Sequence, residues 1–337
     1  MKPTFVISNE ANESISSAFE TIDVSPYDDY PLFKSMVRNI VNNKEFPSDW
    51  LTACSKVKIM RDNEPHSVVV IRNAPVDSHI PELSHEDPQK DKYRLKKTYV
   101  AEATLESFSY LTDTTVMSYD KRFNGDFFTD VYAIKKYIGR QTGYSPGELV
   151  YHNDRTAHPV RADYITLLGM RCPEEEYTST PFVSVESLKN RLTEQQIRAL
   201  SEPYFYTPYD VVTENNNSEL SDPGLHAILS NGSIRYLDSH TTCSSKASDK
   251  HWDAYWALRN ALSRSEKQRH RILEKDLFSF PNMGGLHSRE IIEPYTAMKV
   301  TTRWLLKTYS LTRNHLPETK EYWVTPELPR IGDNMRN

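Results

Sequence analysis

Residues Gln141–Cys172 read QTGYSPGELVYHNDRTAHPVRADYITLLGMRC. Two strand-like stretches, Glu148–His152 and Tyr164–Arg171, enclose a short polar segment that contains Asp154. On a strand, residues i and i+2 point to the same face, so a His-x-Asp sequence at a strand end can offer both side chains to one ion. The stretch therefore predicts a β-sheet protein with a metal site at the end of a strand.

His-x-Asp pairs arise often by chance, so their surroundings decide which one is informative. With 11 histidines and 46 acidic residues in 337, chance predicts about one and a half His-x-Asp/Glu pairs, and three occur. His85 and Asp87 lie in a loop rich in proline and acidic residues. His251 and Asp253 open a predicted helix, where residues i and i+2 diverge by about 200° and cannot share an ion. Only the pair that begins at His152 has the geometry of a strand.

A third ligand is predicted far along the chain. Residues Lys275–Arg289 read KDLFSFPNMGGLHSR and place His287 after a strand, a turn and a Gly-Gly pair. Two histidines and one carboxylate on one face of an ion form the facial triad of non-haem Fe(II) oxygenases. We therefore predict that His152, Asp154 and His287 bind Fe(II). Arg303, in TTRWLLKTYSLTR, offers a planar guanidinium to a carboxylate such as the distal one of 2-oxoglutarate.

The remaining pattern indicates one α+β domain with a mainly β core. We predict a double-stranded β-helix (jelly roll) with flanking and inserted helices. A polar, helical extension is expected over residues 1–65, the core over 66–313 with helical insertions at about 186–202 and 250–275, and a tail over 314–337. Further strands are expected at His66–Ala74, Phe127–Ile134, Thr180–Val185, Tyr204–Thr213, Ile228–Leu237, Leu277–Phe280 and Trp304–Leu311. Helices are expected at Leu32–Asn43, Asp91–Leu111, Glu186–Ala199 and Lys250–Lys275, the last with Trp252, Tyr255 and Trp256 on its buried stripe.

Composition limits the classes of function. The chain has 41 basic and 46 acidic residues and a net charge of −5, so it lacks the basic field that binds nucleic acid. No apolar run is long enough for a membrane span or a signal peptide. Three cysteines (Cys54, Cys172 and Cys243) are too few for a disulfide framework or a thiolate zinc site. We expect a cytoplasmic protein with a small-molecule substrate and no nucleic-acid or membrane partner, and leave the oligomeric state open.

Four stretches together resemble one enzyme family. They are His66–Asp77, Gln141–Cys172, Lys275–Arg289 and Thr301–Arg313, and their order and spacing are similar to the clavaminate synthase-like branch of the Fe(II)/2-oxoglutarate-dependent oxygenases. That branch includes hydroxylases of free arginine, asparagine and lysine. The resemblance implies a jelly roll, Fe(II), 2-oxoglutarate and O2, with hydroxylation of an unactivated C–H bond, or else desaturation or cyclisation.

The chain departs from the pattern of this family in three places. Close relatives usually have His-x-Glu where this chain has His152 and Asp154. Ser288 stands between His287 and Arg289 where relatives often have glycine, and the spacing from His287 to Arg303 is slightly long.

The resemblance also implies roles for other residues. Thr180 is similar to a threonine that binds the 2-oxoglutarate carboxylate, although Thr178 or Ser179 could take this role. Gln141 resembles a glutamine that contacts the amino-acid end of the substrate. Four further candidates come from the positions of the residues in the chain. Asp238 is either a partner for a cationic substrate group or a solvated carboxylate, and Asp222 could cover such a cation. His158 is a structural neighbour of the metal, and Arg289 either approaches the co-substrate carboxylate or holds the distal loop.

The sequence thus predicts a dioxygenase that hydroxylates a small amino acid, with lysine or arginine first, or an amino-acid-derived intermediate of natural-product biosynthesis. A small cyclic or carrier-bound peptide is the alternative substrate, for which Tyr204–Tyr209 could form a wider mouth. Two other classes are considered: a non-catalytic jelly roll that binds a ligand or metal, and a zinc-dependent hydrolase with the same ligands. The hydrolase leaves Arg303 without a role.

Overall fold

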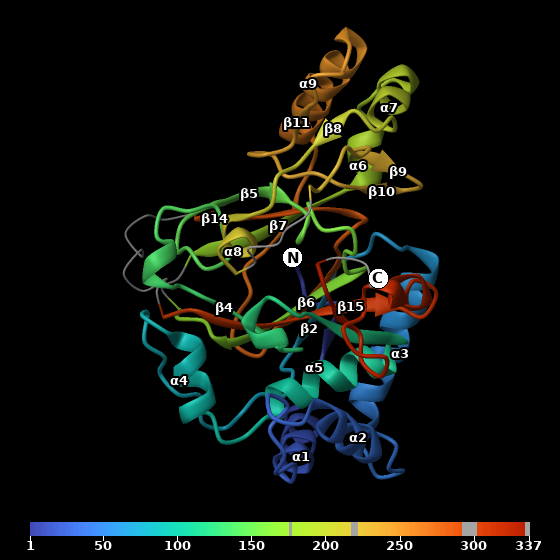
Figure 1. Cartoon of the computed structure of the whole chain (residues 1–337). Helices are drawn as coiled ribbons and strands as arrows, with labels where there is room; N and C mark the ends of the chain where they lie inside the picture. The colour runs from blue at the N-terminus through green and yellow to red at the C-terminus, as the bar shows by residue number, and fades with distance from the viewer. Residues whose placement is uncertain (175–176, 217–221, 292–301, 334–337) are drawn as a thin grey trace.

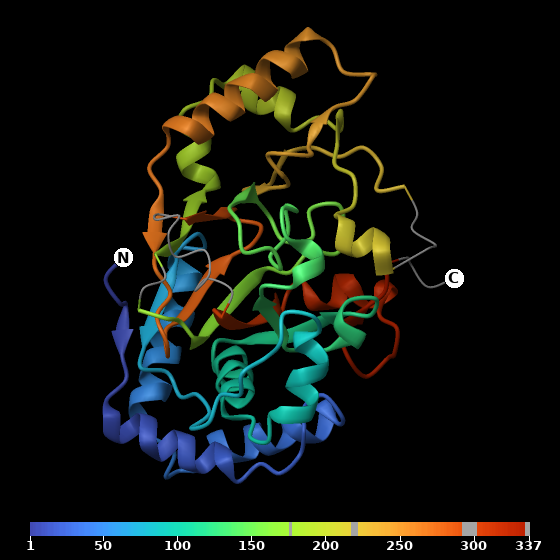
Figure 2. The ribbon, with the colours of Figure 1, turned by 90° about the vertical axis from the view of Figure 1, so that its left-hand side faces the viewer.

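The computed structural model describes residues 1–174, 177–216, 222–291 and 302–333. Two mainly antiparallel β-sheets lie in the middle of the molecule, with one group of helices outside the larger sheet and a second group beyond the smaller one (Figure 1). A view turned by 90° shows the same division, with the N-terminal helices at one end and the inserted helices at the other (Figure 2). Within the described ranges, no helix is long and apolar enough to cross a membrane.

The larger sheet is built around two long, buried strands. β6 (Tyr164–Arg171) and β15 (Trp304–Thr312) pair antiparallel along almost their whole length, and nearly all of their residues are buried. They are buried on both sides because helices cover one face of the sheet and the smaller sheet lies over the other. The order of the described strands is β1 (Phe5–Val6), β2 (Val69–Arg72), β13 (Leu277–Pro281), β6, β15, β3 (Thr114–Tyr119) and β16 (Arg330–Ile331), with β4 (Thr129–Tyr132) also paired to β15.

Four N-terminal helices cover the outer face of the larger sheet (Figure 1). α5 (Val100–Leu111) is at their centre. It is buried along almost its whole length and contacts the other three helices as well as β3, β6 and β15. Trp50 is fully buried and donates from Nε1 to the Ser107 hydroxyl at 3.1 Å, which connects α3 (Ser48–Asn63) to α5. The four helices are α1 (Asn9–Glu20), α2 (Tyr30–Val41), α3 (Ser48–Asn63) and α5 (Val100–Leu111).

The helix predicted at Asp91–Leu111 is wrong as a single element, because the chain bends between α4 (Pro88–Leu95) and α5. Lys96 lies at the bend and is buried, with its ammonium 2.7 Å from Asp77 and 2.9 Å from Glu102. The Asp77 carboxylate also accepts from the first two amides of α5, at 3.2 and 3.3 Å. A buried carboxylate thus begins a new helix where the sequence pattern continues the old one.

The smaller sheet carries the two predicted histidine ligands. It has the order β12 (Gln268–His270), β7 (Thr178–Ser184), β14 (Gly285–Ile291) and β5 (Leu149–His152). Gly285 allows β14 to lie close to β7, since a Cβ at this position would be 2.3 Å from the Phe182 ring and 2.4 Å from the backbone oxygen of Val183. The strand expected to begin at Thr180 begins two residues earlier.

The inserted segments differ from four predictions. The helix predicted at Glu186–Ala199 is two helices, because Thr193 starts a new one with a capping box. The strand predicted at Tyr204–Thr213 is a strand for two residues only, and Asp210 then caps a short helix by accepting from the amides of Val212 and Thr213 at 3.1 Å. The elements are α6 (Val185–Lys189), α7 (Glu194–Leu200), β8 (Phe205–Tyr206), α8 (Val211–Asn216), β9 (Leu229–Ser230), β10 (Ser233–Ile234), β11 (Thr242–Cys243) and α9 (Asp249–Arg264).

The third difference is the strand predicted at Ile228–Leu237. It is instead a hairpin of two short strands, β9 and β10, which pair antiparallel. Asn231 and Gly232 between them have positive φ values of 44° and 78°, and the chain reverses direction there.

The fourth difference concerns the long helix predicted at Lys250–Lys275, which ends at Arg264. Its apolar stripe stops at Leu262, and the chain then forms β12, which pairs with β7 in the smaller sheet. Trp252 and Trp256, predicted on the buried stripe, are 38% and 53% exposed, whereas Tyr255 between them is buried.

Candidate metal centre

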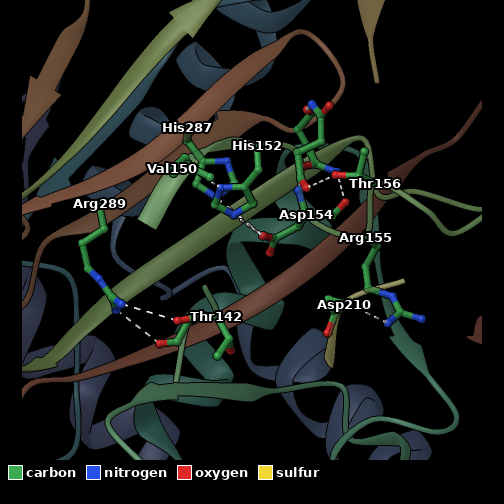
Figure 3. A network of polar contacts seen from close by, with 12 residues as sticks. Thr142, Val150, His152, Asp154, Arg155, Thr156, Asp210, His287 and Arg289 are labelled. Atoms are coloured by element: carbon green, nitrogen blue, oxygen red, sulfur yellow. Dashed lines mark hydrogen bonds and ion pairs between the residues drawn. The ribbon is translucent and has the colours of Figure 1, made fainter. Parts of the chain in front are cut away.

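The side chains of the three predicted ligands lie together at one edge of the smaller sheet. β5 and β14 pair antiparallel with His152 opposite His287, and the centroids of the two rings are 4.2 Å apart. Asp154 follows β5, and its Oδ1 lies 3.3 Å from His152 Nε2 and 3.5 Å from His287 Nε2 (Figure 3). One ligand atom from each residue falls within 4.8 Å of the other two. The sheet register therefore brings together residues that are 135 positions apart in sequence.

Both imidazoles present Nε2 to the same point. The Nδ1–H of His152 donates a hydrogen bond to the Val150 carbonyl at 2.8 Å, which leaves the Nε2 lone pair free for a metal. Burial, and next the neighbouring His152, lowers the pKa of His287 to about 4. His287 is therefore neutral near pH 7, the form that binds a metal. Burial alone would raise the pKa of Asp154, but Lys307 and the two histidines hold it well below its usual range.

Two buried asparagines connect the segments that carry the ligands. Asn282 accepts from the Asp154 amide at 2.8 Å and donates to the Asp154 carbonyl at 3.2 Å. Asn153 donates to the Gly285 carbonyl at 2.8 Å and to the Asn282 carbonyl. The loop after β5 is thus bound to the turn before β14, and the positions of Asp154 and His287 are coupled through the backbone.

A lysine that the sequence analysis missed contacts the predicted carboxylate ligand. The ammonium of Lys307 donates to Asp154 Oδ2 at 2.9 Å and to the Tyr309 hydroxyl at 2.8 Å. Burial would lower the pKa of Lys307, but the Asp154 carboxylate outweighs this effect and raises it. Strand alternation could have identified this lysine from the sequence. Arg303 was predicted to face the site, and on a strand residues 305, 307 and 309 face the same side as residue 303; all four line one cavity.

This cavity lies beside the three ligands and is lined from both sheets. Arg303 stands just before β15, is 5% exposed and lines the cavity together with the predicted ligands. Thr180 of β7 also lines it, whereas Thr178 and Ser179 do not belong to the lining. Apolar walls come from Ile165, Leu167 and Leu305. The structure thus places Arg303 and Thr180 at the same cavity as the ligands.

Gln141 and Arg289 line the cavity as well, but both are bound to the surrounding backbone. The Gln141 amide accepts from the Val150 amide at 3.1 Å and donates to the Glu148 carbonyl at 3.3 Å. The Arg289 guanidinium donates to the Gly147 and Gly143 carbonyls at 2.8 and 3.3 Å. Figure 3 shows it turned toward the neighbouring Thr142, whose carbonyl lies 3.5 Å away. These contacts bind Arg289 to the loop over residues 142–147, whereas either the co-substrate or the distal loop around His287 was predicted as its partner.

Asp238, Asp222 and His158 are outside the residues that line the cavity. Asp238 accepts from the Tyr236 hydroxyl at 2.6 Å and lies 3.6 Å from the Arg259 guanidinium of α9. Asp222 is exposed, and its carboxylate accepts from the Gly224 amide. His158 is buried, with Nδ1 2.7 Å from the Val160 carbonyl and Nε2 3.4 Å from Asp333, so its contacts are those of a structural residue.

A cluster of three charged residues, Asp210, Arg122 and Arg155, also lines the cavity and was not predicted. Asp210, which caps α8, lies 3.1 Å from Arg122 and 3.9 Å from Arg155. Burial opposes its ionisation, but the two guanidinium groups lower its pKa to about 2. Arg155 follows Asp154 directly and has a positive φ of 60°. These contacts connect α8 to the loop that carries the carboxylate ligand, and no motif in the sequence marks them.

Comparison with known proteins finds matches among solved structures. No family model and no curated protein matches the sequence. An asparagine oxygenase in complex with Fe(II), 3-hydroxyasparagine and succinate superposes with a TM-score of 0.80 at 18% identity, over 98% of this chain and 99% of that chain. The non-haem iron oxygenase OrfP in complex with Fe and α-ketoglutaric acid gives a TM-score of 0.77 at 18% identity, over 98% of this chain and all of the other.

The chain has the fold of these non-haem iron oxygenases. The jelly roll with flanking and inserted helices is therefore confirmed as the fold class. The match includes most of residues 1–65 as well, since 98% of this chain is covered. Two imidazole nitrogens and one carboxylate oxygen on one side of a buried cavity also form a donor set that fits Fe(II).

Proposed function

We propose that this protein is a non-haem Fe(II)- and 2-oxoglutarate-dependent dioxygenase that hydroxylates a small amino acid or an amino-acid-derived intermediate. The main support for this proposal is that Asp154 Oδ1 lies 3.3 and 3.5 Å from the Nε2 atoms of the two histidines, beside a cavity that Arg303 also lines. In the proposal, His152, Asp154 and His287 hold the iron. Fe(II) and 2-oxoglutarate, when bound, supply oxidation of an unactivated C–H bond by O2, coupled to the formation of succinate and CO2.

The other residues of the cavity have distinct roles in this proposal. Arg303 binds the distal carboxylate of 2-oxoglutarate through a charge-assisted pair, and the Thr180 hydroxyl donates to the same group. Ile165, Leu167 and Leu305 exclude water from the reacting positions. Gln141 shapes the wall next to His152, because both ends of its amide bind the backbone that leads into β5.

The substrate class is supported by what the similar structures contain. One holds 3-hydroxyasparagine, and another OrfP complex holds (3S)-hydroxy-L-arginine with Fe and succinate. A preference for lysine or arginine depends on a free carboxylate in the pocket. Asp238, the residue predicted for this, contacts Tyr236 and Arg259 instead of lining the cavity. We therefore propose a free amino acid as substrate and test basic and neutral side chains side by side.

Substrate-dependent succinate formation tests the proposal. Purified protein with Fe(II), 2-oxoglutarate and O2 is incubated with each proteinogenic amino acid and with small cyclic peptides. We expect succinate above the substrate-free rate for at least one free amino acid, and a product heavier by one oxygen atom. Turnover of peptides alone would contradict the amino-acid proposal. Hydrolysis without O2 consumption would favour a metal-dependent hydrolase, and iron binding without any turnover would favour a non-catalytic binding protein.

A further inference from the structure

The two oxygens of the Asp154 carboxylate face different groups. Oδ1 lies toward the two histidines, at 3.3 and 3.5 Å from their Nε2 atoms. Oδ2 lies 2.9 Å from the ammonium of Lys307, which comes from the opposite sheet. The side chains of Asp154 and Lys307 are 14% and 10% exposed, so this pair is largely shielded from water.

Neighbouring residues restrict the movement of both Asp154 and Lys307. The Lys307 ammonium also donates to the Tyr309 hydroxyl at 2.8 Å, and the Tyr309 ring packs against Tyr119 with centroids 5.2 Å apart. On the other side, Asn282 binds the amide and the carbonyl of Asp154. A carboxylate whose backbone is fixed and whose Oδ2 accepts a charge-assisted hydrogen bond is restricted in turning Oδ2 toward the histidines.

We propose that Lys307 is a positioning residue that keeps Asp154 a one-oxygen metal ligand. The inference rests on the proposed function, because it assumes a metal at the three ligands. A carboxylate can bind a metal through one oxygen or both. If Oδ2 also bound, it would take one of the open positions opposite the triad, on which this class of site depends. By donating a hydrogen bond to Oδ2, Lys307 would keep that coordination position open for other ligands.

The proposal predicts that a neutral side chain at position 307 has opposite effects on two affinities. Lys307→Met removes a positive charge beside a cation site and frees a second donor oxygen, so Mn(II) should bind roughly threefold to tenfold more tightly. 2-Oxoglutarate should then bind the Mn(II)-loaded variant more weakly, since fewer positions are open to it. An ion pair that served only the fold would give weaker Mn(II) binding together with a lower Tm.

Calorimetry with Mn(II), without turnover, measures both affinities. Lys135→Met is the matched control, because Lys135 is exposed and pairs with Glu86 outside the cavity; both affinities should stay at the wild-type values. Tyr309→Phe removes only the hydroxyl that accepts a hydrogen bond from the Lys307 ammonium. We expect it to change both affinities in the same direction as Lys307→Met, but by less. Weaker Mn(II) binding in Lys307→Met with an unchanged Tm would overturn the proposal.

A crystal structure of the Mn(II)-loaded wild type decides the question even where Lys307→Met does not fold. We expect Mn(II) on Oδ1 with the Lys307 ammonium on Oδ2. Mn(II) on both oxygens would overturn the role of Lys307 and leave the proposed function intact. Mn(II) bound away from His152, Asp154 and His287 would instead count against the proposed function itself.

Discussion

His152 and His287 are oriented before any metal arrives. The Val150 carbonyl fixes the His152 ring, and His287 packs against Phe280 with ring centroids 4.6 Å apart. Both imidazoles are almost buried, and the lowered pKa of His287, about 4, keeps that ring neutral near pH 7. This preorganisation means that a metal does not have to displace a proton from His287 at neutral pH.

Replacement of either histidine should abolish metal binding while the protein still folds. We expect His152→Ala and His287→Ala to lose measurable Mn(II) binding in calorimetry, because the two remaining ligands hold a divalent ion poorly. The circular dichroism spectrum should match that of the wild type. Wild-type affinity in either variant would remove that residue from the site.

Arg303 should act on the co-substrate more than on the amino acid. Arg303→Leu is expected to raise the KM for 2-oxoglutarate by roughly ten- to several-hundred-fold, the usual effect of losing a charge-assisted bidentate pair. The KM for the amino acid should change far less. Steady-state kinetics at saturating concentrations of the other substrate separate the two values, and an unchanged 2-oxoglutarate KM would assign the anchor to another residue.

Some site residues could be predicted from sequence and others could not. His152, Asp154 and His287 stand out because strand alternation and the facial-triad pattern restrict where a histidine and a carboxylate can cooperate. Lys307 was not predicted, because a lysine on a strand is usually solvated and its partner Asp154 follows a strand of the other sheet. Asp238 lies 3.6 Å from Arg259, and this pairing depends on where α9 packs, which the local sequence does not indicate.

At the scale of elements, the sequence pattern placed the central strand β6 correctly but failed at breaks within helices and in the inserted strands. The predicted strand Tyr164–Arg171 coincides with β6, because an apolar, β-branched run between turn residues has few other solutions. The helix predicted to continue to Lys275 ends at Arg264, because the next residues pair with β7 in the sheet. Such an ending is decided by tertiary pairing, which local pattern does not contain.

The connection between β5 and β14 should depend on Asn282. Asn282→Ala leaves the Asp154 amide and the Ala162 carbonyl without this side chain, and we expect a loss of about 1–3 kcal/mol in the free energy of unfolding. Mn(II) affinity should fall as well, because the position of Asp154 is no longer fixed.

Urea denaturation and calorimetry measure these two effects of Asn282→Ala. Asn190→Ala, at an exposed residue that follows α6, serves as the control and should change neither quantity. Equal Mn(II) affinity in Asn282→Ala and wild type would show that the asparagine supports the fold alone.

For the whole molecule, buried histidines should set the stability in mild acid. Burial lowers the pKa of His158 to about 4 and that of His226 to about 3, and His287 is lowered likewise. Each pKa is below the ordinary value near 6.5, so between about pH 6.5 and 4 the unfolded chain binds more protons than the folded one. The free energy of unfolding should therefore fall as the pH falls through this window, by up to about 1.4 kcal/mol per pH unit for each histidine.

Urea unfolding of the metal-free protein at several pH values between 7 and 4 measures this slope. His158→Gln should flatten it, whereas His79→Gln, at an exposed position, should leave it unchanged. His315 has the opposite sign, since Asp163 raises its pKa, and its contribution is lost as the pH rises through that value. Stability that does not change between pH 7 and 4.5 would contradict the assignment.

The central claim is that one cavity binds Fe(II) and 2-oxoglutarate together, and it can be tested without turnover. Fe(II) and 2-oxoglutarate are added to the protein under anaerobic conditions, and the visible spectrum is recorded. We expect a charge-transfer band that requires both additions and is absent in His287→Ala. Well-folded protein that binds Fe(II) but develops no such band with 2-oxoglutarate would contradict the claim.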